Sequence, residues 1–163
     1  MAQRRSPTES SCAGCGAAIE GGAAACQRLF DEFRARETAT LARDYRSTRL
    51  TVDVYCLQHP ERYCVSAKSL AAHLTGLAWA RERDGGEDGL RVLQRWLDAP
   101  GDLVKPPLPA ARGAVTIVDV APANDPDDYL RRLDLWASST WEAYSGLHRV
   151  ALDWIDLAFG SLG

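Results

Sequence analysis

Apolar residues recur at helical spacing along most of this 163-residue chain, and the pattern predicts a mainly α-helical protein. Leucine and phenylalanine mark one face of a segment from residue 26 to about 45, with arginine and glutamate on the other. A second stripe follows Ser66, a suitable N-cap, and runs to about residue 83. A shorter stripe ends before Pro100.

Two further helices are expected towards the C-terminus. Asp125 is a suitable cap, and Pro126 a suitable first residue, for one of them. From about Ser139 another apolar stripe continues to Phe159. The pattern therefore predicts a helical bundle of four to five helices.

Residues 47–60 have an ambiguous pattern. Part of the segment alternates like a strand, but the apolar residues from Leu50 to Leu57 are also spaced as on a helix. We favour a helix, with Ser47 or Thr48 as its cap and a proline at its end.

Residues 115–120 are the one convincing strand-like run, so we expect at most one short extended β segment, lying on the helices. Residues 1–11 are polar and are expected to form a disordered tail. The remaining residues, 12–163, are long enough for one helical domain with a real core.

The charge pattern argues against a nucleic-acid partner. The net charge is only -3, and no basic face of the kind that neutralises phosphates stands out. Six arginines between residues 28 and 49 alternate with acidic residues, including Glu37 and Asp44. We interpret this as a solvated helix face with opposite-charge pairs.

No apolar run resembles a secretory signal or a membrane span, so we expect a cytoplasmic protein with no membrane partner. In a reducing compartment, cysteines are thiols or metal ligands more often than disulfides. The odd total of five also argues against a fully paired framework.

A run of soft ligands in the first half of the chain predicts a metal site. Cys12 and Cys15 form a C-x-x-C-G knuckle, Cys26 opens a predicted helix, and His59 closes another. Three thiolates and one imidazole suit a tetrahedral zinc ion, and we take these four residues as its ligands. Two substitutes for the histidine stay open, His73 and Cys56. A different interpretation is that the cysteines are free thiols, Cys26 being a small core residue.

A second hypothesis is a metal-dependent enzyme. If the helices bring His59, His73 and His148 together near Asp53, three ligands and an open position can activate water. This site competes with the first for His59. Asp53 can instead be a hydrogen-bond acceptor that orients His59 or His73.

Other features do not identify an activity. There is no phosphate loop, dinucleotide fingerprint or nucleophile elbow. The tryptophans at 136, 141 and 154 are at helical spacing, which is more typical of a core than of a ligand pocket. An interaction module that uses the knuckle for a protein partner, or a homo-oligomer, is a third possibility.

Together, the cysteine knuckle, the segment from Cys26 to Phe30 and the L-T-V-D-x-Y-x-L-Q-H-P motif at 50–60 resemble an uncharacterised bacterial domain-of-unknown-function family. The resemblance implies a small bacterial protein without an assigned activity. Cys56 and Cys64 are not part of the resembling motif. The prediction from sequence is thus a zinc-binding helical protein with a structural metal, and whether it is an enzyme stays open.

Overall fold

The computed structural model describes residues 9–160, and they form a mainly helical fold, as predicted. Six long helices and two single-turn helices replace the four to five that were expected. Within residues 9–160 there is no β-strand, only an isolated bridge between Ser11 and Ala18. The helices are α1 (Gly22–Arg36), α2 (Tyr45–Gln58), α3 (Pro60–Tyr63), α4 (Ala67–Glu82), α5 (Glu87–Asp98), α6 (Ile117–Val120), α7 (Pro126–Ala143) and α8 (His148–Gly160).

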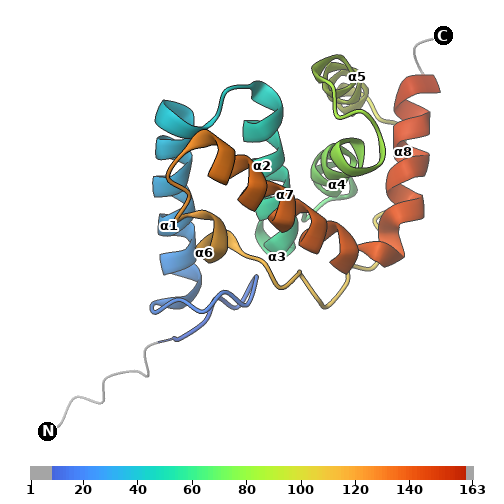
Figure 1. Ribbon diagram of the computed structural model, residues 1–163. Helices are drawn as coiled ribbons and strands as arrows, with labels where there is room; N and C mark the ends of the chain where they lie inside the picture. Colours follow the sequence, from blue (N-terminus) through green and yellow to red (C-terminus); the bar gives the residue numbers. More distant parts are fainter. Residues whose placement is uncertain (1–8, 161–163) are drawn as a thin grey trace, which may run out of the picture.

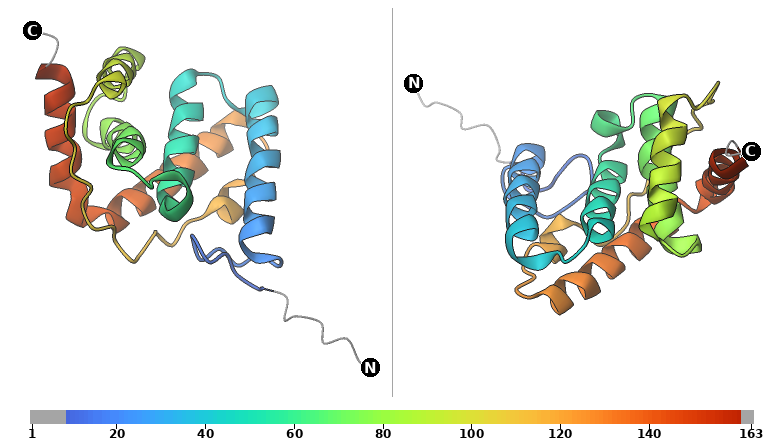
Figure 2. Two further views of the ribbon diagram at one scale, coloured as in Figure 1. Left: turned by 180° about the vertical axis from the view of Figure 1, so that it is seen from behind. Right: turned by 90° about the horizontal axis from the view of Figure 1, so that it is seen from above.

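Helix α4 lies at the centre of the arrangement. It packs against α2 on one side and against α5 and α8 on the other, while α7 crosses both α2 and α4 (Figures 1 and 2). Helix α1 lies at the far edge beside α6. In the described part of the chain, no helix is both long and apolar enough to cross a bilayer.

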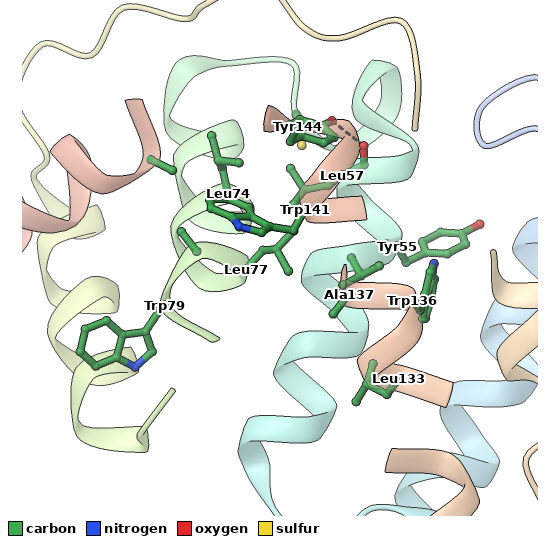
Figure 3. Close-up of a cluster of buried hydrophobic side chains, with 14 of the residues drawn as sticks. Tyr55, Leu57, Leu74, Leu77, Trp79, Leu133, Trp136, Ala137, Trp141 and Tyr144 are labelled. Carbon is green, nitrogen blue, oxygen red and sulfur yellow. Dashed lines mark hydrogen bonds between the residues drawn. The ribbon is translucent and has the colours of Figure 1, made fainter. Parts of the chain in front are cut away.

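The core is built where α2, α4 and α7 meet (Figure 3). Leu74 and Leu77 of α4 and Trp136 of α7 are completely buried there. Tyr144 donates a hydrogen bond to the Leu57 carbonyl oxygen, which joins the end of α7 to α2. Trp141 and Trp154 are also buried, so the interpretation of the tryptophans as core residues is confirmed.

Gln58, at the end of α2, anchors the long connection between α5 and α6. Its amide nitrogen donates to the carbonyl oxygens of Arg112 and Val115, at 3.0 and 2.8 Å. Its amide oxygen accepts from the Trp136 indole nitrogen at 2.8 Å. Because all these groups lie in or at the core, one side chain fixes both the connection and the α2–α7 packing.

The helical interpretation of residues 47–60 is confirmed, but its cap is different. Asp44 accepts hydrogen bonds from the backbone N–H of Ser47 at 2.9 Å and from its hydroxyl at 2.7 Å. The helix therefore begins at Tyr45, and the prediction of Ser47 or Thr48 as the cap was wrong. The expected caps Ser66 and Asp125 do cap α4 and α7.

The prediction of an extended segment at residues 115–120 was wrong. Ile117–Val120 forms α6, a single helical turn. Thr116 and Asp119 form a capping box, in which the Asp119 carboxylate accepts from the Thr116 backbone N–H at 2.8 Å. These local hydrogen bonds outweigh the strand preference of the valines and the isoleucine.

The boundary of the last helix also differs from the prediction. Helix α7 continues to Ala143, a 3-10 turn covers Ser145–Leu147, and α8 begins at His148 rather than near Ser139. The apolar stripe continues across the turn, which explains why one continuous helix was expected.

Residues 1–8 of the predicted tail lie outside the described residues. Its last residues are described, and they pair with the loop that follows. Ser10 accepts a backbone hydrogen bond from Ile19, and Ser11 bridges to Ala18. The treatment of 12–163 as one domain stays a prediction.

The charged face expected between residues 28 and 49 is only partly solvated. Glu37 is fully buried in a π-helical turn, Glu37–Leu41, that follows α1. Its carboxylate accepts from the hydroxyl groups of Thr51 and Tyr129, at 2.5 and 2.6 Å, and pairs with Arg34. The expected surface position was wrong for this residue because α2 and α7 cover it.

Candidate metal centre

The cysteine knuckle is a tight loop held by its own backbone. The Cys12 N–H donates to the Ala17 carbonyl oxygen at 2.9 Å, and the Gly16 N–H donates to that of Cys12 at 2.8 Å. Gly16 has φ 77°, a conformation that residues with a side chain rarely adopt. The loop passes beside the first turns of α1 and close to α3 (Figures 1 and 2).

The other two candidate ligands come from helix ends. Cys26 lies near the start of α1 and is fully buried, while His59 occupies the junction of α2 and α3. The His59 Nδ1–H donates to the Tyr55 carbonyl oxygen at 2.7 Å. In the neutral imidazole, this bond keeps the proton on Nδ1 and leaves Nε2 free to bind a metal, which is a common arrangement for metal-binding histidines.

The structure brings the four predicted residues, Cys12, Cys15, Cys26 and His59, into one group. Their ligand atoms all lie within 4.8 Å of one another, and all four residues are buried. The His59 Nε2 is 3.6 Å from the sulfur atoms of both Cys12 and Cys26. The sulfur atoms of Cys15 and Cys26 are 3.8 Å apart.

These distances fit a tetrahedral ion. With metal–sulfur bonds of about 2.3 Å and metal–nitrogen bonds of about 2.0–2.1 Å, neighbouring ligand atoms are roughly 3.5–3.8 Å apart. Without an ion, three thiols and an imidazole packed this closely would have few partners except one another. The group can therefore hold a metal ion.

The thiols influence one another even without an ion. The hydrogen bond to Cys26, together with burial, raises the pKa of Cys15 to about 12. The same bond lowers the pKa of Cys26. The Tyr55 hydroxyl lies 3.8 Å from the Cys26 sulfur and also favours the thiolate there. A metal ion that bound Cys15 would therefore have to displace the proton of its thiol.

A comparison with protein families matches residues 10–145 to a family of unknown function, DUF5946. The chain belongs to this family. All four residues of the cluster fall within the DUF5946 match, whereas α8 lies beyond it. No curated protein and no solved structure matches the chain.

The two substitute ligands lie outside the cluster of this DUF5946 member. Cys56 is buried, and its burial raises the pKa of its thiol to about 12. Cys64 is a neighbour of similar character, whose sulfur contacts the Cys56 carbonyl oxygen at 3.7 Å. His73 instead bonds to Asp53, with its Nδ1 2.9 Å from the carboxylate.

The histidine site of the enzyme hypothesis is not assembled. Asp53 pairs with both His73 and Arg49, and the Arg49 Nε is 3.0 Å from its carboxylate. His148 stacks on Trp141 and bonds to its carbonyl oxygen at 2.7 Å. Among residues 9–160, the cysteine–histidine cluster is the one group of three or more histidine, cysteine, aspartate or glutamate side chains that lie close enough to hold an ion.

Asp53 was expected to orient either His59 or His73, and it contacts His73. Sequence reasoning missed Tyr55, which orients His59 through its carbonyl oxygen and stacks on its ring at 4.1 Å. One sign was available, because Tyr55 precedes His59 by four residues and so lies on the same helix face.

Proposed function

We propose that this chain is a small helical zinc protein whose metal is structural. The ion would be held by Cys12, Cys15, Cys26 and His59. The observation that carries the proposal is the mutual spacing of the four ligand atoms, which all lie within 4.8 Å of one another in a buried group.

Ligand chemistry favours zinc over other metals. Thiolate sulfur and imidazole nitrogen are soft or borderline ligands, which select zinc over magnesium or calcium. Three cysteines and one histidine are a common structural zinc set. Such a site needs reduced thiols, so the proposal includes a cytoplasmic location.

A structural role follows from the number and burial of the ligands. Four protein ligands complete a tetrahedron and leave no position for a substrate, whereas catalytic zinc sites keep one open. The least buried of the four residues, His59, is only 9% exposed. The ion would join the N-terminal loop to the start of α1 and the end of α2.

Elemental analysis of the purified protein tests the proposal. We expect about one zinc per wild-type chain and little zinc in the Cys12→Ser/Cys15→Ser variant, which should also melt at a lower temperature. Cys56→Ala/Cys64→Ala is the control, because it removes two buried thiols outside the cluster. Zinc that is undiminished in the serine variant would refute the proposal.

The histidine ligand is tested separately with cobalt in place of zinc. His59→Ala should weaken cobalt binding and change the visible spectrum of the tetrahedral site. His73→Ala, which removes the other histidine considered from sequence, should leave the spectrum unchanged. If His73→Ala changes the spectrum and His59→Ala does not, the fourth ligand is His73.

A further inference from the structure

A cavity of about 350 Å³ adjoins the cluster on the side of the N-terminal loop and α3. Gly14 and Ala23 form part of its wall, together with the His59 ring. The proposed structural role of the metal does not involve this cavity. Its size suits a small organic ligand, and half-open apolar cavities with a few polar groups are typical ligand sites.

Aromatic rings give the cavity a fixed shape. Tyr55 lies between Phe30 and His59, with ring centroids at 3.7 and 4.1 Å. Tyr63 meets Tyr55 edge to face, with centroids 6.1 Å apart. Both tyrosines line the cavity, but Tyr55 is only 1% exposed and is covered by Phe30 and His59. The half-buried Tyr63 ring therefore supplies the aromatic surface that would pack against a planar ligand.

The polar groups of the cavity supply more hydrogen-bond donors than acceptors. The Gln27 amide oxygen accepts from the Tyr63 hydroxyl at 2.7 Å, from Arg62 at 3.2 Å and from the Tyr55 hydroxyl at 3.4 Å. Since an amide oxygen has two lone pairs, the Tyr63 hydroxyl and Arg62 already fill its capacity. Asp31 holds the Gln27 amide nitrogen at 2.9 Å, which keeps the oxygen turned towards these donors.

The charges of the cavity favour an anion. Arg62 is exposed and has five N–H donors, of which its bond to Gln27 uses one. Glu61 also lines the cavity, but its carboxylate accepts from Arg112 at 2.8 Å. The guanidinium of Arg62 is thus the charged group best able to meet a ligand.

We propose that the cavity binds a small planar organic anion, an aromatic carboxylate. Its ring would pack against Tyr63 and the wall formed by Gly14 and Ala23, and its carboxylate would accept from Arg62. Arginine and carboxylate form strong paired hydrogen bonds, which would replace the weaker ones now shared on Gln27. The proposal goes beyond the structural zinc, and it does not depend on which metal the cluster holds.

Nuclear magnetic resonance titration of the isotope-labelled full chain, purified with its bound metal, tests the proposal. The probes are 2-naphthoate and its uncharged analogue 2-naphthamide, which has nearly the same shape. We expect saturable shifts for 2-naphthoate at the backbone amides of Gly14, Ala23 and Arg62. We also expect 2-naphthamide to bind about tenfold more weakly.

Three variants separate the cavity from general surface charge. Arg62→Gln should weaken 2-naphthoate binding about tenfold and leave 2-naphthamide binding unchanged. Ala23→Phe, which fills the cavity and keeps the arginine, should weaken both probes. Arg95→Gln, at an exposed position on α5, should affect neither. Metal content measured for each variant keeps this result separate from a failure of the zinc proposal.

The proposal is overturned if 2-naphthoate gives no saturable shifts at these amides, or if its shifts lie on another face. It is also overturned if both probes bind equally well and Arg62→Gln changes neither.

Discussion

The His59 side chain is constrained at both ring nitrogens. Nδ1 donates to the Tyr55 carbonyl oxygen, while Nε2 faces the sulfurs of Cys12 and Cys26. The ring also touches the knuckle directly, since a Cβ atom added to Gly14 would lie 2.6 Å from the His59 Cδ2. The absence of a side chain at residue 14 therefore determines how closely the loop approaches the imidazole.

The Gly14→Ala variant should weaken metal binding. Its added methyl group must displace the His59 ring or the loop, and overpacking of this kind costs about 1–3 kcal/mol. Competition with a coloured chelator would measure the loss of affinity. Gly146→Ala is the matched control, because its Cβ would meet no described atom within 4 Å. Equal affinities for the two variants would contradict the prediction.

The buried thiols Cys56 and Cys64 predict a loss of stability in alkali. Burial raises the pKa of each from 9.0 to about 12. Above pH 9 the unfolded chain releases these protons and the folded chain keeps them, so stability falls as the pH rises towards 12. Each thiol contributes a slope of about 1.4 kcal/mol per pH unit within that window.

Urea unfolding from pH 8 to 10.5 would compare the wild type with Cys56→Ala/Cys64→Ala. The free energy of unfolding of the wild type should fall more steeply with pH, because the variant lacks both groups. Parallel curves would show that the two thiols ionise equally in both states.

At the scale of elements, α2 contributes to both the core and the cluster. Gln58 is the last residue of this helix, and His59 follows it. Near the middle of the helix, the Thr51 hydroxyl donates a hydrogen bond to the buried Glu37. The π-helical turn at Glu37–Leu41 places this carboxylate between α2 and α7.

The Glu37→Gln variant should destabilise the protein by about 2–4 kcal/mol, because a buried ion pair loses its charge and an amide donor meets two hydroxyl groups. The loss is limited because Arg34 is 31% exposed and its guanidinium can bond to water. Chemical denaturation would measure the change. Glu32→Gln, at an exposed position of α1, should change stability by no more than about 0.5 kcal/mol. A similar small effect at residue 37 would contradict the expected role.

Periodicity predicted the long helices well, because their apolar stripes are recorded directly in the sequence. It failed at residues 115–120, where a capping box decides the local structure of a single turn. It also failed at Glu37, whose spacing from Arg34 is that of an ordinary surface pair. Burial by α2 and α7 depends on tertiary packing, which no local pattern contains.

At the scale of the whole molecule, the candidate cluster joins the edge of the fold to its body. The grouping of Cys12, Cys15, Cys26 and His59 could be predicted because soft ligands are few and the C-x-x-C-G spacing is specific. The separation of His73 and His148 from this cluster could not be predicted from sequence. Their partners, Asp53 and Trp141, are defined only by the packing of distant helices.

Removal of the metal should loosen one part of the molecule. We expect faster hydrogen exchange in residues 9–26 after chelation, because the ion would link this segment to α2. The amides of α4 should stay protected, since this helix packs against α2, α5 and α8. Exchange measured by mass spectrometry on the wild type, with and without chelator, tests this. Uniform loss of protection, or none in residues 9–26, would contradict it.

The order of the four ligands along the chain has a consequence for synthesis. Cys15 and Cys26 are 11 residues apart, but His59 follows Cys26 by another 33. In a growing polypeptide, the three sulfur ligands would emerge from the ribosome before the imidazole does. An ion captured at that stage would have water or a carrier molecule as its fourth ligand. Once α2 is complete, His59 would displace that fourth ligand. The last step of metal loading would then be the formation of a helix end.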